Sequence, residues 1–173
     1  MARGFAFDVG AVLGVGEPDA SPLPEAQEGE IVLRVSDGVS LIQLRDSAAG
    51  KELIWQDQIW YERYDWPKKG VAPGIYRLRI PVPRSDSMTF PEQLALLPAG
   101  EVAAPVTLVA AALFCLKQVG QPDPLQGKLT RCAESAGDGC RAGLIWFFHR
   151  VGVCDYWDND RCDFIGLSSV RTS

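Results

Sequence analysis

Alternating apolar and polar positions predict strands in the first half of the chain. Residues 30–35 form a short β-prone run, and Gly74 to Val82 alternates cleanly. Val39 to Asp46 has apolar positions at helical spacing, but a strand is compatible with the same residues. Ile54-Trp55 and Ile59 to Tyr61 are aromatic and β-branched, which favours strands. The sequence therefore leaves open whether residues 39–46 form a helix or a strand.

A capping-box pattern predicts a short helix after these strands. Thr89 can accept an amide proton from the first turn, while Glu92 reaches back to the backbone of Thr89. The helix is expected to continue through Leu97, because Pro98 to Gly100 favours a turn.

A second, longer helix is predicted next. Pro105 suits a first helical turn, and the helix should run to about Val119, before the turn-forming residues Gly120 to Pro124. The apolar run 103–116 is too short to span a membrane, so it indicates a buried core helix.

The pattern changes to short strands after Gly127. Four are predicted: Leu129 to Cys132, Gly143 to Phe148, Gly152 to Trp157 and Ile165 to Arg171. The order predicts an α+β domain with two helices and a short-stranded antiparallel C-terminal sheet, arranged as a meander. Residues 1–29 are rich in Gly, Pro, Ala and Glu and are expected to be an irregular lead-in to a single domain over 30–173.

Charge and cysteine content narrow the function. The net charge is −5 and the basic residues are scattered, which argues against a nucleic-acid or anionic-membrane partner. The five cysteines are odd in number and lack CxxC spacing, so reduced thiols in a cytoplasmic protein are expected. A metal site is not expected, because paired ligands are missing and His149 is the sole histidine. No cofactor is predicted, and a monomer is favoured.

The last 33 residues differ in composition from the rest. Lys, Glu, Gln and Met are absent from 141–173, whereas the first 140 residues contain five Lys, nine Glu, eight Gln and two Met. Aromatic and acidic side chains also follow no single alternation in Ile145 to His149 and Cys154 to Asp160. Two interpretations remain open: a buried strand beside a solvated acidic turn, or a surface made for contact.

The same C-terminal segment resembles a known family pattern. Arg141 to Trp146, then Asp158 to Leu167, then Val170-Arg171 are similar to the end shared by formylglycine-generating, sulfatase-modifying proteins and the variable proteins of diversity-generating retroelements. Both groups close in a pattern like Arg-x-Asp-x-Ile-Gly-Phe-Arg, from which Leu167 and Ser168 depart. The resemblance covers roughly residues 30–173 and implies a C-type-lectin-like fold.

The resemblance to variable proteins also implies a set of ligand-binding residues. Adenine-directed mutagenesis of AAC-type codons does not reach Lys, Glu, Gln or Met, which would account for the composition of the tail. Trp codons contain no adenine, so Trp146 and Trp157 are expected to be fixed framework residues packed in the core. The positions of the variable kind are Ile145, Phe147, Phe148, His149, Tyr156, Asp158, Asn159, Asp160, Cys162 and Phe164.

Three other chemistries fit the residues less well. A formylglycine-generating-type oxidase needs a reactive cysteine pair, but Cys154 and Cys162 stand among aspartates that disfavour thiolates. A calcium-dependent sugar-binding lectin is suggested by Gln121 to Asp123 and by Trp157 to Asp160, yet both motifs are imperfect. A hydrolase lacks a Gly-x-Ser-x-Gly elbow. The sequence therefore predicts a protein that recognises a protein ligand and is not an enzyme.

Overall fold

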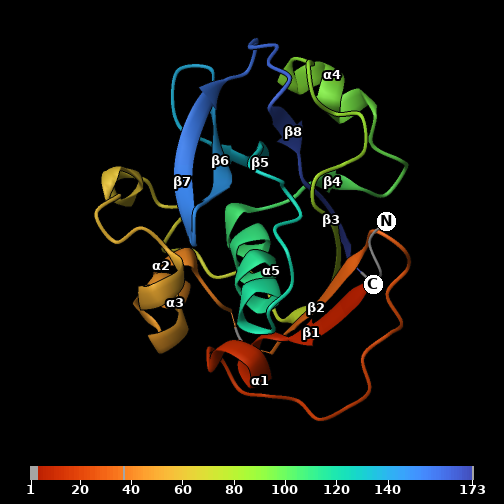
Figure 1. Ribbon diagram of the computed structural model, residues 1–173, viewed down its shortest axis with the longest axis vertical. Helices are drawn as coiled ribbons and strands as arrows, with labels where there is room; N and C mark the ends of the chain where they lie inside the picture. Colours follow the sequence, from red (N-terminus) through yellow and green to blue (C-terminus); the bar gives the residue numbers. More distant parts are fainter. Residues whose placement is uncertain (1–3, 37, 173) are drawn as a thin grey trace.

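The computed structural model describes residues 4–36 and 38–172, and it is built around one central helix between two sheets. Helix α5 (Val106–Gln118) lies in the middle of the molecule, with the two sheets on either side of it (Figure 1). Every residue of α5 from Val106 to Leu116 is buried. A helix that is apolar all round is stable only inside a core, and this position supplies one.

The first sheet joins the two ends of the chain. Its strand order is β1-β2-β3-β9-β4; β1 and β2 are parallel and the other pairs are antiparallel. The strands are β1 (Phe5–Asp8), β2 (Ile31–Val35), β3 (Gly74–Arg79), β4 (Val102–Ala103) and β9 (Ser169–Thr172). All five residues of β2 are buried. The strand has neighbours on both edges, core residues on one face, and on the other face residues 19–22, whose carbonyls accept from Arg34.

The second sheet is built from the C-terminal third and has the order β7-β6-β5-β8. Its strands are β5 (Leu129–Ser135), β6 (Cys140–Phe147), β7 (Arg150–Trp157) and β8 (Ile165–Leu167). The predicted meander is present in β5, β6 and β7, which pair antiparallel in chain order. The sheet is not wholly antiparallel as predicted, because the chain after β7 crosses to the far side of β5 and β8 pairs there in parallel.

The helices begin where side chains can cap them. Thr89 and Glu92 form the predicted capping box of α4 (Phe90–Ala95). Three further short helices were not assigned from the sequence: α1 (Val9–Leu13), α2 (Leu41–Asp46) and α3 (Ala48–Leu53). Ser40 begins α2 with a second capping box, which decides the segment left open between helix and strand in favour of helix. The described part of the chain is therefore α+β, with five α-helices rather than two.

Two aromatic runs do not form the strands that their composition favours. Ile54 makes one isolated bridge to Val151, and Trp60–Arg63 forms a 3₁₀ helix, η1. The segment predicted as one strand over residues 165–171 is divided between β8 and β9, which belong to different sheets. Within the expected N-terminal lead-in, β1 and α1 are regular and residues 14–29 contain no helix or strand. Among the described residues, no helix is long and apolar enough to cross a membrane.

Candidate functional site

The β6–β7 hairpin presents its side chains alternately to two faces. One face, here called the inner face, packs into the core beside α5 through Ala142, Leu144, Trp146, Val151 and Val153, all of them buried. The opposite, outer face carries Ile145, Phe147 and Tyr156 at the alternate positions. The strand period thus separates core residues from the residues predicted to meet a ligand.

The turn between β6 and β7 displays three of the predicted residues. Phe147 is 50% exposed and Phe148 is 76% exposed, with their ring centroids 4.3 Å apart in an edge-on arrangement. Phe148 adopts a φ of 53°, a left-handed conformation that is uncommon for a bulky residue. His149 is also exposed. Large apolar side chains on a tight, exposed turn stabilise little in the monomer, which favours a role in contact.

The far end of the hairpin lies next to α4 (Figure 1) and carries a second aromatic pair. The ring centroids of Tyr156 and Phe164 lie 6.0 Å apart, and Phe164 is 42% exposed. Burial raises the pKa of the Tyr156 hydroxyl, and Cys154 and Cys162 raise it further. The hydroxyl is consequently neutral at pH 7 and remains a hydrogen-bond donor. Ile145 is half-buried midway along the outer face.

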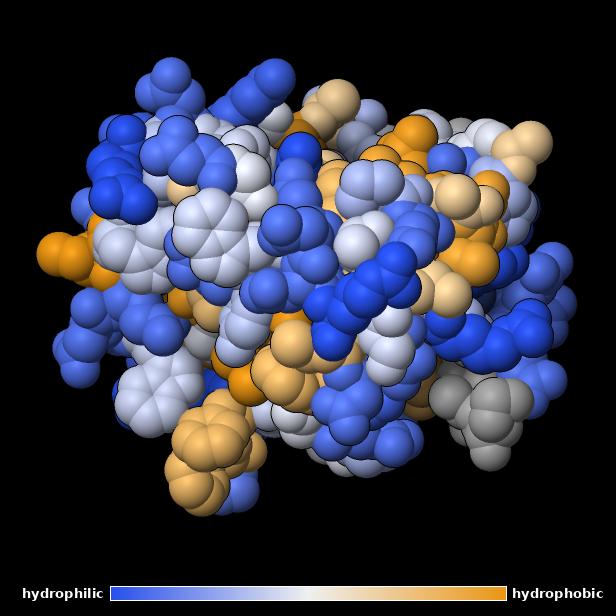
Figure 2. Space-filling model, turned by 90° about the horizontal axis from the view of Figure 1, so that it is seen from above, coloured by the Kyte–Doolittle hydropathy of each residue, from blue (hydrophilic) through white to orange (hydrophobic). Residues whose placement is uncertain are grey.

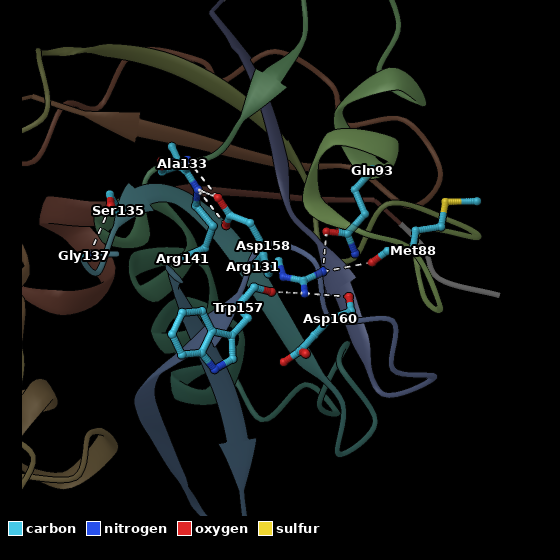
Figure 3. A network of polar contacts seen from close by, with 10 residues as sticks. All are labelled: Met88, Gln93, Arg131, Ala133, Ser135, Gly137, Arg141, Trp157, Asp158 and Asp160. Carbon is cyan, nitrogen blue, oxygen red and sulfur yellow. Dashed lines mark hydrogen bonds and ion pairs between the residues drawn. The ribbon is translucent and has the colours of Figure 1, made fainter. Parts of the chain in front are cut away.

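A buried arginine fastens the loop that follows β7 to the rest of the molecule (Figure 3). Arg131 is fully buried and donates to the Met88 carbonyl at 3.0 Å and to Gln93 Oε1 at 3.1 Å. Its second terminal nitrogen donates to the carbonyls of Trp157 at 2.6 Å and Asp160 at 2.9 Å. Burial lowers the pKa of the guanidinium. One side chain thus holds residues 157–160 against α4 and its preceding turn.

Asp158 is bound within the protein rather than displayed. Arg141 Nε lies 3.1 Å from Asp158 Oδ1, and the guanidinium lies 4.5 Å from the centroid of the Phe90 ring. The Asp158 carbonyl accepts from the Phe90 N–H at 2.7 Å, and its N–H donates to Gly139. The pair with Arg141 joins the loop to β6 (Figure 3), and the hydrogen bond from Phe90 joins it to α4. Asp158 therefore helps to shape the candidate site.

Of the remaining loop residues, Asn159 exposes its side chain, and Asp160 and Cys162 are held by their backbone carbonyls. Asp160 is half-buried, and its carbonyl is one of the acceptors of Arg131. The Cys162 carbonyl accepts from the Ser87 N–H at 2.9 Å and the Ile165 N–H at 3.2 Å, so this residue is anchored by its backbone whatever its side chain. Such anchoring lets side chains in the loop change without loss of the backbone path.

The two tryptophans expected in the framework differ. Trp146 is 7% exposed on the inner face, and the Lys117 ammonium lies 4.7 Å from its ring centroid. The prediction that Trp157 packs in the core is wrong, because this side chain is 55% exposed. The cross-strand partner of Trp157 is Cys140, the first residue of β6. Helix α5 begins beside Glu134 on β5, because Glu134 Oε2 accepts from the Val106 N–H. Trp157 thus lies beyond the start of the core helix.

Residues 55–60 cover the edge of β7 that does not pair with β6, and the sequence offers no indication that this segment belongs to the site. Gln58 Oε1 accepts from the Val153 N–H at 2.8 Å, Trp60 Nε1 donates to the Val153 carbonyl at 3.2 Å, and the Trp55 N–H donates to the Val151 carbonyl. An edge strand normally leaves such groups unpaired. Nothing in the local pattern of residues 54–60 indicates this pairing, since its partner is almost a hundred residues away.

Two of the cysteine thiols are poorly suited to nucleophilic chemistry. Burial raises the pKa values of the Cys154 and Cys132 thiols, which keeps them protonated and poorly nucleophilic. The five cysteines are free in the structure. Among residues 4–36 and 38–172, no group of three or more His, Cys, Asp or Glu side chains could hold a metal ion.

The candidate residues lie on an open surface rather than in a hollow. Three hollows of about 590, 980 and 470 Å³ are found among the described residues. The first lies between β1, the end of β3 and residues 122–126, and the second lies between α4, β4 and residues 66–76. The third lies between residues 79–88 and the end of α4, and none of the ten predicted residues lines any of the three. An open surface of this kind suits a macromolecular partner better than a small molecule.

Comparison of the chain with protein-family models, with curated proteins and with solved structures found no match in any of the three.

Proposed function

We propose that this protein is a receptor-like binding protein with a C-type-lectin-like fold, whose β6–β7 hairpin and following loop recognise a protein ligand. The observation that carries the proposal is the division of the hairpin into two faces. Core residues occupy the inner face, and exposed or half-exposed aromatic side chains occupy the outer face and the two ends. Recognition requires no chemistry from the protein, so the proposal does not make it an enzyme.

The residue types support a protein ligand. Exposed Phe and Tyr side chains give a large contact area at a low cost in conformational entropy, and Asn and Asp provide adaptable hydrogen bonds. The anionic charge of the chain disfavours nucleic acid, which binds clustered cations. The resemblance of the tail to the variable proteins of diversity-generating retroelements supports the same role, because in those proteins this segment varies.

The rigid support beneath the surface is what such a role needs. Arg131 and Arg141 anchor the loop by hydrogen bonds to backbone carbonyls and to Asp158, while Gln58 and Trp60 hold the edge of β7. Exposed side chains can then change identity while the backbone that carries them keeps its path. Pre-organisation of this kind reduces the entropic cost of binding.

The coding region beside the gene offers a direct test. A reverse transcriptase gene and a near-copy of the segment encoding residues 144–164 should lie close by. The two copies should differ at adenines in the codons of exposed residues such as Phe147, His149 and Asn159, and agree at Trp146 and Trp157. Differences concentrated instead at the inner-face codons of Leu144 and Val153 would contradict the proposal, because those changes would disrupt the core.

A display experiment tests the same idea with the protein itself. A phage library randomised at exposed positions should remain folded and yield binders to an arbitrary target such as streptavidin. The positions are Phe147, Phe148, His149, Tyr156, Asn159 and Phe164. A matched control library, randomised at the inner-face residues Ala142, Leu144, Trp146, Val151 and Val153, should lose display. Equal recovery of folded clones from both libraries would count against a division between scaffold and surface.

A further inference from the structure

The loop end of the hairpin exposes a tryptophan among carboxylates. We call this set the Trp157 patch: Trp157 with Asp138, Asp155 and Asp160. Trp157 is 55% exposed, Asp138 and Asp155 are exposed, and Asp160 is half-buried. An exposed indole contributes little to the stability of the monomer, and the contact area it offers is the largest of any side chain.

The carboxylates of the patch share one neighbourhood. The Cys140 thiol, opposite Trp157 across the strands, has its pKa raised by burial and then by Asp155, Asp158, Asp138 and Asp160. Asp158 is neutralised by Arg141. In the part of the chain that the structure describes, no ion pair joins Asp138, Asp155 or Asp160 to a cation. The buried Arg131 guanidinium interacts electrostatically with Asp160. Among the described residues, the negative charge of Asp138 and Asp155 remains without an ion pair, and this charge favours a cationic partner.

The spacing of these carboxylates fits an extended partner better than a single ion. Within the described residues they do not form a group that could hold a metal ion. Figure 2 looks onto this end of the molecule, where ring-shaped side chains of intermediate hydropathy stand beside hydrophilic ones and the most hydrophobic atoms form separate areas. A mixed surface of this kind suits a polar, charged segment rather than an apolar helix.

We propose that the Trp157 patch docks an arginine-bearing basic segment of the protein ligand. The inference rests on the proposed function and names the chemical class of the partner. A guanidinium stacks on an indole face and presents forked N–H groups to carboxylates on either side, which an ammonium does less well. Trp157 has no adenine in its codon and Asp138 precedes the diversified segment, so both are constant anchors on a surface that otherwise varies.

The test uses fluorescein-labelled hexaarginine as the probe and the full chain as the receptor. Binding is followed by fluorescence polarisation at low and at physiological salt. Wild-type protein should bind hexaarginine more tightly than hexalysine. The Trp157→Ala variant should weaken hexaarginine binding by about fivefold, the size of an exposed cation–π contact, and should reduce the preference for arginine over lysine.

A charge-matched pair of variants separates the patch from the net charge. Changing Asp138, Asp155 and Asp160 to Asn should weaken binding by about tenfold or more. The control changes Glu17, Glu28 and Glu52 to Gln; all three are exposed and lie outside the patch, so binding should fall by less than about twofold. Thermal melts of each variant confirm that it is folded. This is expected because the altered side chains are exposed, apart from the half-buried Asp160, where Asn keeps the size of the side chain.

Three outcomes would overturn the inference: no binding of hexaarginine by wild-type protein at low salt, equal losses in the two charge variants, or no effect of Trp157→Ala. Failure of the proposed function is seen separately, in the display libraries. If exposed positions yield binders but hexaarginine does not bind at the Trp157 patch, the function stands and the basic partner is rejected. If hexaarginine binds at the patch and the libraries yield no binders, the patch stands and the diversified surface is rejected.

Discussion

Trp146 and Trp157 face the same side of the β6–β7 hairpin, yet Trp146 is buried and Trp157 is exposed. Trp157 lies six residues along β7 from Val151, the cross-strand partner of Trp146. Trp146 lies over α5, whose residues fill the space beneath it. Trp157 lies past the start of α5, where the strands extend beyond the core. Strand alternation decides which side of a sheet a residue faces, but the length of the element beneath decides whether that side is covered.

The largest expected effect separates these two tryptophans. Trp146→Ala should lower the free energy of unfolding by about 3–5 kcal/mol, because it leaves a cavity against α5. Trp157→Ala should change it by no more than about 0.5 kcal/mol, because the side chain is mostly solvated. Urea denaturation followed by circular dichroism measures both. Similar losses for the two variants would mean that Trp157 is covered in solution.

The next largest effect is the loss of stability when Arg131, which anchors residues 157–160, is replaced. Arg131→Met should destabilise the protein by about 3 kcal/mol, because a fully buried side chain loses its four hydrogen bonds. Arg161→Met is the matched control, since Arg161 is exposed and its one ion pair within the described residues is with Glu92 at the surface. Its cost should stay within about 0.5 kcal/mol in the same denaturation experiment. Greater damage from the Arg161 variant would show that the loop is held from its outer side.

A smaller effect, the pH dependence of stability, tests whether the start of α5 covers Glu134. Burial raises the pKa of Glu134 above its ordinary value of 4.5. A carboxyl with a raised folded pKa contributes stability that is fully present below pH 4.5 and is lost as pH rises through the folded pKa. Glu134→Gln keeps an acceptor for the Val106 N–H and removes the titration. Wild type should therefore gain stability relative to this variant as pH falls from 7 to about 4.5.

The matching measurement is the free energy of unfolding of both proteins at several pH values. The difference between them isolates Glu134 from the other carboxyl groups. A difference that stays constant from pH 7 to about 4.5 would mean that the Glu134 carboxyl is well solvated, and that α5 does not close over this end of β5.

Local signals in the sequence predicted local features well. The Thr89 and Glu92 capping box and the apolar run of α5 depend on nearby residues, and both are present in the structure. The exposure of Trp157 depends on where a distant helix begins, and the division of β8 from β9 depends on which sheet each strand joins. The sequence indicates only that Arg131 is a polar residue of a strand. Its burial depends on α4 and residues 157–160, which fold over it.

The central claim is that exposed side chains vary on a scaffold that does not depend on them. Its most direct test is one variant with five exposed residues changed together, each to Ser or Asn, with Asn at the left-handed position. The residues are Phe147, Phe148, His149, Asn159 and Phe164. The free energy of unfolding should stay within about 1 kcal/mol of wild type, a smaller change than Trp146→Ala alone produces. A five-residue variant that unfolds or precipitates, while Trp146→Ala remains folded, would contradict the account, because the hairpin would then be held together by the face assigned to the ligand.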